Sequence, residues 1–157
     1  MWSNAVVSIH LAPHATELPQ PVSEVVAVAG RGLTGDRYFE GRGTYSKRPE
    51  PARECTLIEM EALEALERDY GLPLGAAASR RNVATRGVPL NHLVGRRFRM
   101  GEAELEGIRL CEPCQHLAEM VQSASARQGL IHRGGLRARI VAGGKVRVGD
   151  SIALLPE

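Results

Sequence analysis

The sequence predicts a predominantly β domain of the α+β class, barrel-like or strongly curved, with helices covering one side. Roughly seven or eight short segments carry strand patterns, only two carry the spacing of an amphipathic helix, and strands and helices do not alternate repeatedly. The chain has 157 residues and is 43% hydrophobic, which suits one hydrophobic core. We therefore expect a single domain over residues 1–157.

The chain begins with two predicted strands. Residues 5–11 and 22–29 alternate apolar and polar side chains, as strands with one buried face do, and a turn that contains proline separates them. Five glycines then fall within residues 30–43. They indicate a backbone that turns tightly or approaches a ligand closely.

A strand and a helix are predicted next. The strand covers residues 54–58, and the helix runs from about residue 59 to residue 70, with Met60, Leu63 and Leu66 on its core face. Gly71 is a typical helix stop. Residues 74–94 are interrupted by glycine and proline and predict only short-range structure.

The second half of the chain predicts five strands, over residues 97–100, 103–110, 136–142, 145–148 and 151–155. Gly143-Gly144 and Gly149-Asp150 separate the last three of them and predict two hairpins. A second helix is predicted over residues 113–126, with an apolar face that packs inward.

The net charge of +2 conceals an uneven distribution of arginine. Lys47 and Lys145 are the only lysines among 20 basic residues, and residues 80–99 and 127–147 each hold six basic residues and no acid. Arginine suits bidentate contacts with phosphate or carboxylate, although a solvated basic face is the alternative interpretation. Only six aromatic residues are present, which leaves little for base stacking, so we do not expect a nucleic-acid partner.

The segment Cys111-Glu-Pro-Cys114 lies where a strand is expected to lead into the second helix. Backbone N–H groups at a helix N-terminus stabilise a thiolate, which a nucleophile or a metal ligand requires. Three interpretations compete: a thioredoxin-like redox pair, a structural zinc site that includes His116, and a single functional thiolate. A further alternative is that Cys111 and Cys114 are partly buried residues with only a structural role. Cys55 lies inside a predicted strand and is expected to be an inert core thiol.

The cellular setting follows from composition. Three cysteines do not form a disulfide framework, residues 1–13 have no signal-peptide pattern, and no apolar run is long enough to span a membrane. We therefore expect a cytoplasmic protein without a membrane partner.

The segment Arg80-Arg81-Asn82-Val-Ala-Thr85 supplies two guanidinium groups, an amide and a hydroxyl within six residues. Such a set can hold an anionic group through directional hydrogen bonds. Residues 30–35 match the G-x-G-x-x-G spacing, but a loop rather than a helix follows them, so a dinucleotide site is not expected.

Seven fragments occur in a characteristic order along residues 5–155. They are Gly35-Asp36-Arg37, Thr56-Leu-Ile-Glu before the helix, Arg80-x-Asn82-x-x-Thr85-x-Gly87, Leu93-x-Gly95-Arg-x-Phe98-x-x-Gly101, Pro113-Cys114, Arg133-Gly134-Gly135 and Gly149-Asp150. This series resembles the MOSC domain, named for the C-terminal domain of molybdenum cofactor sulfurase. The resemblance implies a β-rich, barrel-like MOSC fold and a link to the molybdenum cofactor.

The resemblance also implies roles for individual residues. Cys114 corresponds to the functional cysteine, which carries sulfur as a persulfide or binds molybdenum as a metal ligand. Arg80 and Asn82 correspond to the pair that holds the phosphate of molybdopterin. The remaining residues assigned to cofactor binding are Arg81, Thr85, Asp36 and Arg37.

The resemblance leaves several functions open. The sequence shows neither the N-terminal β-barrel half of the amidoxime-reducing relatives nor the aminotransferase-like domain of fused sulfurases, so we expect no pyridoxal phosphate chemistry within these residues. The chain would act as a sulfur carrier with a cysteine desulfurase, or as a molybdenum-dependent reductase component with an electron-transfer partner. The alternatives are a non-catalytic domain that binds an anion or nucleic acid, and a C-x-x-C thiol redox protein.

Overall fold

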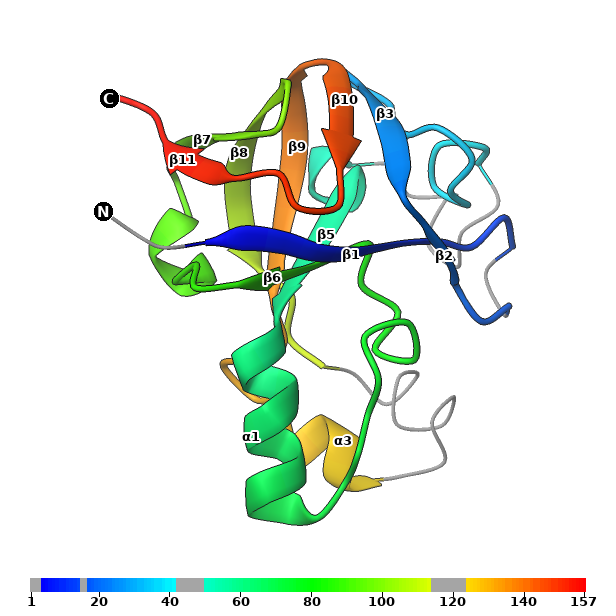
Figure 1. Cartoon of the computed structure of the whole chain (residues 1–157), viewed down its shortest axis with the longest axis vertical. Helices are drawn as coiled ribbons and strands as arrows, with labels where there is room; N and C mark the ends of the chain where they lie inside the picture. The colour runs from blue at the N-terminus through cyan, green and yellow to red at the C-terminus, as the bar shows by residue number, and fades with distance from the viewer. Residues whose placement is uncertain (1–3, 15–16, 42–49, 114–123) are drawn as a thin grey trace.

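The computed structural model describes residues 4–14, 17–41, 50–113 and 124–157, and its strands form two sheets (Figure 1). The larger sheet contains, from edge to edge, β11 (Ile152–Leu154), β7 (Arg97–Met100), β8 (Ala103–Leu110), β9 (Leu136–Ala142), β5 (Cys55–Glu59), β6 (Val83–Arg86), β1 (Ala5–Leu11) and β2 (Gln20–Val22). The smaller sheet contains β10 (Gly144–Arg147), β3 (Glu24–Val28) and β4 (Gly32–Leu33). The helices are α1 (Met60–Tyr70) and α3 (Ala124–Gly129), with short 3-10 helices η1 (Pro51–Arg53) and η2 (Leu90–Leu93). The α+β class is therefore confirmed.

The larger sheet curls without closing into a barrel. Its described strands leave β11 and β2 as the two edges. The first half of β1 nevertheless bonds to the connection between β10 and β11, because the Val6 N–H donates to the Asp150 carbonyl and the Gly149 N–H donates to the Val6 carbonyl, both at 2.8 Å. These two backbone bonds connect β1, which lies next to the edge strand β2, with the chain segment that leads into the other edge strand, β11.

One parallel strand pair lies inside the otherwise antiparallel sheet. β5 leads into α1, and β6 then returns to pair parallel with β5, with Leu57 opposite Val83. The predicted helix is confirmed, including Gly71 in the left-handed conformation at its end, with φ of 68°. The prediction of only short-range structure over residues 74–94 was wrong at β6, whose partner lies across a helix rather than in a neighbouring hairpin.

Both predicted glycine hairpins are wrong. β10 pairs with β3 of the smaller sheet, and β11 pairs with β7 at the edge of the larger one. At residues 143–144 the chain leaves β9 and crosses to the smaller sheet, and a Cβ on Gly143 would lie 2.7 Å from the Ala27 carbonyl oxygen. The glycines therefore allow the chain to pass close to the smaller sheet. A Gly-Gly pair is typical both of such a close approach and of a tight hairpin turn, so the sequence alone does not distinguish the two.

Two further predicted elements differ in extent. The strand expected over residues 22–29 is divided at Ser23, so that β2 joins the larger sheet and β3 joins the smaller one. Residues 114–123 of the expected second helix lie outside the described residues, and α3 begins at Ala124.

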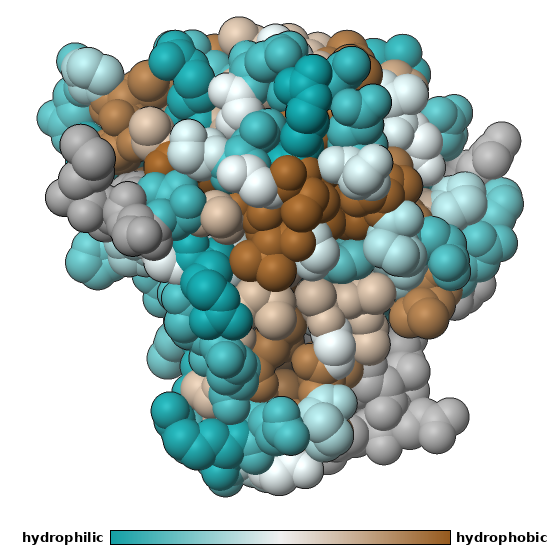
Figure 2. Space-filling view, in the orientation of Figure 1, coloured by the Kyte–Doolittle hydropathy of each residue, from teal (hydrophilic) through white to brown (hydrophobic). Residues whose placement is uncertain are grey.

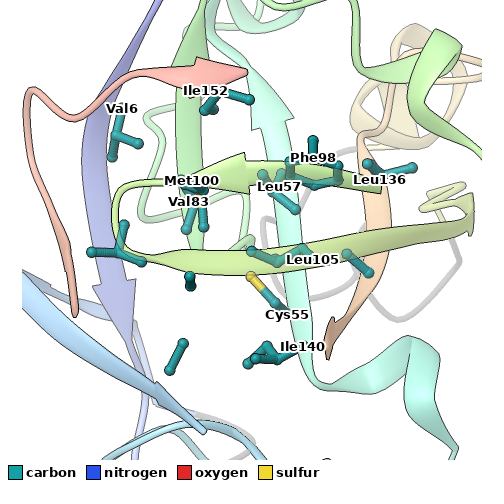
Figure 3. Close-up of a cluster of buried hydrophobic side chains, with 14 of the residues drawn as sticks. Val6, Cys55, Leu57, Val83, Phe98, Met100, Leu105, Leu136, Ile140 and Ile152 are labelled. Carbon is teal, nitrogen blue, oxygen red and sulfur yellow. The ribbon is translucent and has the colours of Figure 1, made fainter. Parts of the chain in front are cut away.

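The main core lies between the two sheets and is almost entirely apolar. Figure 3 shows part of it, with Phe98, Leu105 and Leu57 from three strands of the larger sheet. The Cys55 side chain lies in the same cluster and has no exposed surface. Such burial supplies most of the driving force that holds the sheets together.

The helices pack together at one end of the larger sheet (Figure 1). Leu63 and Leu66 of α1 are buried against Ile58, Ala84 and Leu130, so the predicted apolar face of this helix is confirmed. In Figure 2 apolar residues also gather on the outer surface over β1. None of the described helices is long and apolar enough to cross a membrane.

Candidate functional site

The residues of the Arg80–Thr85 segment enter the larger sheet from the loop after α1. Ser79, Arg80, Arg81 and Asn82 are consecutive and all buried, although each carries a polar side chain. Arg80 has φ of 65°, which turns the backbone sharply before β6. Because burial of polar groups costs free energy unless they have partners, the contacts of each side chain indicate its role.

The Asn82 side chain connects three parts of the fold. Its Oδ1 accepts hydrogen bonds from the Thr56 N–H and the Thr56 hydroxyl, both at 3.1 Å. Its Nδ2 donates to the His10 carbonyl at 3.3 Å. Thr85 is also fully buried, and its hydroxyl donates to the Ile58 carbonyl at 3.5 Å. These contacts give both side chains a structural role in joining β1, β5 and β6.

The Arg81 guanidinium contacts three backbone carbonyls. Nε donates to Gly134 at 2.9 Å, Nη1 to Ser79 at 3.2 Å and Nη2 to Cys111 at 3.2 Å. Gly134 lies just before β9, Ser79 lies in the loop before β6, and Cys111 directly follows β8. Arg81 therefore joins chain segments that are far apart in the sequence.

Asp36 and Arg37 bond to each other, and Arg80 lies within electrostatic range of both. Asp36 is 1% exposed, and its Oδ1 accepts from the Ala12 N–H at 3.2 Å and from Arg37 Nη1 at 3.4 Å. Arg80 Nη1 donates to the Glu17 carbonyl. Burial, followed by the nearby charge of Arg37, lowers the pKa of Arg80 to about 10. Two buried guanidinium groups thus lie within electrostatic reach of each other, and the Asp36 carboxylate bonds to one of them.

Tyr38 adds an aromatic group to this arrangement. The Arg37 guanidinium lies 5.0 Å from the centre of the Tyr38 ring. Tyr38 also lines a pocket of about 430 Å³, together with Gly30, Arg31, Phe39, Gly41, Glu50, Pro51, Arg53 and Glu54. The glycine-rich segment from residue 30 was the sequence signal for this pocket, but nothing in the sequence assigned Tyr38 or Arg31 to a site.

The cysteines are placed differently from one another. Burial, reinforced by the nearby carboxylates of Asp36 and Glu54, raises the pKa of the Cys55 thiol far above its ordinary value, in agreement with an inert core residue. Cys111 is 1% exposed, and its N–H donates to the Gly135 carbonyl at 2.7 Å. Cys114 and His116 lie outside the described residues.

The arginines on the strands are largely engaged with carboxylates. Arg97 and Arg139 both bind Glu106, at 3.5 and 2.9 Å, and Arg147 binds Glu102 at 3.3 Å. Opposite charges on neighbouring strands are the usual arrangement of a solvated sheet surface. Arg139 and Arg147, within the arginine-rich stretch at residues 127–147, are therefore paired with carboxylates.

No group of three or more His, Cys, Asp or Glu side chains is arranged to hold a metal ion within the described parts of the chain. The zinc interpretation depended on Cys111 together with Cys114 and His116, two of which are beyond those parts. The cluster that the structure does assemble is cationic and suits an anion rather than a cation.

Comparison with known proteins gives a consistent result. A family model described as the MOSC domain matches residues 17–153. The YuaD protein of Bacillus subtilis has a solved structure with a TM-score of 0.81 and 19% identity, and the match covers 98% of each chain. The YiiM proteins of Geobacillus stearothermophilus and Escherichia coli have TM-scores of 0.75 and 0.73 at 19% and 20% identity, and the matches cover 98% of this chain and 75% and 70% of theirs. At this identity the structures show a shared fold, and no curated protein matches the sequence.

Proposed function

Because the chain belongs to the MOSC domain family, we propose that it acts in molybdenum-cofactor or sulfur chemistry, with Cys114 as the functional thiol. The family is associated with molybdenum-cofactor-related function. Within that association, we propose that the chain carries sulfur as a persulfide on Cys114 or binds a molybdopterin-type cofactor.

The buried pair of Arg37 and Arg80 is the observation that carries this proposal. Two guanidinium groups lie close enough for the charge of Arg37 to lower the pKa of Arg80, and the Asp36 carboxylate accepts a hydrogen bond from Arg37. Burying like charges is costly, and an anion placed against them would offset that cost. Guanidinium groups also match the geometry of phosphate oxygens, so this donor set fits the phosphate of molybdopterin.

Within this proposal, the predicted cofactor residues divide into two groups. Arg37 and Arg80 would contact the phosphate, and Asp36 would orient Arg37 through their 3.4 Å contact. Asn82 and Thr85 would hold the strand and loop that carry Arg80, since their polar atoms bond to neighbouring strands.

The sulfur-carrier chemistry requires a thiolate at Cys114. This thiolate would attack the terminal sulfur of a persulfide on a cysteine desulfurase. A new S–S bond forms at Cys114, the S–S bond of the donor breaks, and the donor cysteine leaves as a thiolate. The step consumes no oxidant or reductant, because the terminal sulfur passes from one persulfide to another.

The cofactor chemistry uses the same thiol as a ligand. A bound molybdenum cofactor would supply oxygen-atom transfer or N–O reduction, with electrons from a separate electron-transfer partner. A soft thiolate is a suitable ligand for such a metal. Arg37 and Arg80 would orient the cofactor through its phosphate.

The test is to express the chain in a host that makes the molybdenum cofactor and to measure molybdenum, pterin fluorescence and intact mass. The apoprotein is also incubated with a cysteine desulfurase and cysteine. Either stoichiometric molybdenum with pterin, or a mass increase of one sulfur atom, is expected.

The two cysteines of the C-x-x-C segment provide matched variants. Cys114→Ser should abolish the signal, whereas Cys111→Ser should retain it, because the Cys111 side chain is buried. Equal loss in both variants would favour a redox pair. Stoichiometric zinc, or no molybdenum, pterin or persulfide in the unmodified protein, would overturn the proposal.

A further inference from the structure

Arg81 connects two parts of the proposed site that no strand ladder connects. The loop before β6 carries Arg80, and Cys111 directly follows β8, three residues before Cys114. In the larger sheet β9 and β5 lie between β8 and β6, so these two strands share no backbone hydrogen bonds. The 3.2 Å bond from Arg81 Nη2 to the Cys111 carbonyl crosses that separation directly.

The start of β9 completes this connection. The Gly134 carbonyl accepts from Arg81 Nε at 2.9 Å, and the Gly135 carbonyl accepts from the Cys111 N–H at 2.7 Å. A Cβ on Gly134 would collide with the Cys111 carbonyl oxygen, so only glycine allows this approach. Cys111 is therefore held by both of its backbone polar groups.

A second contact holds the next residue of the same segment. The His132 N–H donates to Glu112 Oε1 at 2.9 Å, and the Asn91 side chain donates to the His132 carbonyl at 2.7 Å. His132 has φ of 62°, a conformation that is costly for a residue with a side chain. The residue that bonds to the Glu112 side chain, His132, therefore lies in a strained turn.

We propose that Arg81 is a positioning residue, which sets the place of the Cys111–Pro113 segment relative to the Arg37–Arg80 pair and does not contact the ligand. This inference rests on the proposed function and assigns to Arg81 a role different from cofactor binding. Each of its three guanidinium nitrogens already donates to a backbone carbonyl. Lysine could not reproduce this contact, because one ammonium group cannot reach three separated carbonyls in a fixed plane.

The first test uses the unmodified protein and inorganic phosphate as the probe. Arginine Nε–H signals are followed by ¹⁵N NMR as phosphate is added. The signals of Arg37 and Arg80 should shift with saturation, while that of Arg81 should stay in place and remain protected from solvent exchange. A saturable shift of the Arg81 signal as large as that of Arg80 would overturn the proposal.

The second test compares Arg81→Lys with Arg80→Lys, which alters the neighbouring residue with the same change of side chain. Loss of hydrogen bonds to a charged group should speed exchange of the Cys111 amide in Arg81→Lys about tenfold or more. In Arg81→Lys, iodoacetamide should also alkylate Cys114 at a different rate than in the unmodified protein. The phosphate affinity of this variant should stay within about twofold of that of the unmodified protein. Arg80→Lys should show the reverse, with weaker phosphate binding and unchanged exchange at Cys111.

The outcomes separate this inference from the proposed function. Unchanged Cys111 exchange in Arg81→Lys, with weakened phosphate binding, would refute the positioning role. If Arg81→Lys does not fold, the NMR titration of the unmodified protein decides. If phosphate shifts no arginine signal, the proposed phosphate contact fails, and the exchange comparison still decides the role of Arg81, since it needs neither cofactor nor sulfur.

Discussion

Replacing Asn82 with alanine should reduce stability strongly, because its side chain joins three strands from a buried position. Asn82 is 4% exposed and makes hydrogen bonds to the Thr56 N–H, the Thr56 hydroxyl and the His10 carbonyl, at 3.1, 3.1 and 3.3 Å. Alanine removes all three and leaves the Thr56 and His10 backbone groups buried without those partners. This cost falls on the fold rather than on a ligand.

The magnitude follows from the number of bonds. Each buried hydrogen bond contributes about 1 kcal/mol net, so Asn82→Ala should lower the free energy of unfolding by about 3 kcal/mol. For a domain of this size, that loss corresponds to a decrease of roughly 6–12 °C in the melting temperature. It is a large part of the total stability of a typical domain.

Urea unfolding followed by far-UV circular dichroism measures this loss. The midpoint should fall while the slope of free energy against urea stays constant, since the variant exposes the same surface on unfolding. Asn91→Ala is the control, because the exposed Asn91 side chain donates a hydrogen bond to the His132 carbonyl and does not join strands of the larger sheet. It should cost less than about 1 kcal/mol.

A decrease of less than about 1 kcal/mol in the free energy of unfolding of Asn82→Ala, together with weaker phosphate binding, would contradict this prediction. That result would mean that the amide acts on a ligand, as the resemblance to the family implies, and that the contacts with Thr56 and His10 contribute little.

Two further predictions concern backbone strain and pH. Gly135→Ala should cost more than about 3 kcal/mol, because φ is 112° and the new Cβ would collide with the Leu57 carbonyl, whereas Gly149→Ala, with φ of 95° and open space, should cost about 1–2 kcal/mol. Equal urea midpoints for the two variants would contradict this. Burial lowers the pKa of His10 below its usual 6.5, so the unfolded chain takes up a proton first and stability should fall as the pH drops below about 6.5. His10→Asn should flatten that dependence in urea unfolding between about pH 7 and pH 5, and an unaltered slope would exclude His10 as its cause.

The local pattern of the sequence predicted the elements that depend on neighbouring residues. The strands over residues 97–100 and 103–110 have the predicted bounds, since their alternation and the Gly101 turn lie within one short stretch. The helix over α1 was predicted for the same reason, with a clear apolar face and a glycine stop. Pairing between distant strands left no such signal, so β6 was missed and the two hairpins were wrongly assigned.

In the candidate site, too, the sequence indicated the residue types, and the tertiary structure determined the partners of their side chains. The sequence indicated Arg80, Arg81, Asn82 and Thr85 as residues suited to hold an anion, and the family resemblance added Asp36 and Arg37 to the cofactor site. The structure separates them. The Asn82 and Arg81 side chains bond to the backbone of other chain segments, whereas the charge of Arg37 acts on Arg80. Residue type alone carries no information about which partner a guanidinium or an amide finds.

The sequence by itself determined the α+β class, the main helix, most strands and membership of the family, because these depend on periodicity and on the order of short motifs. The tertiary structure decided which strands pair, that the sheet curls without closing, and that Arg81 joins β8, β9 and the loop before β6. Hydrogen-bond partners and burial arise only when distant segments meet, so the chemistry of each polar side chain depends on contacts that no local pattern contains.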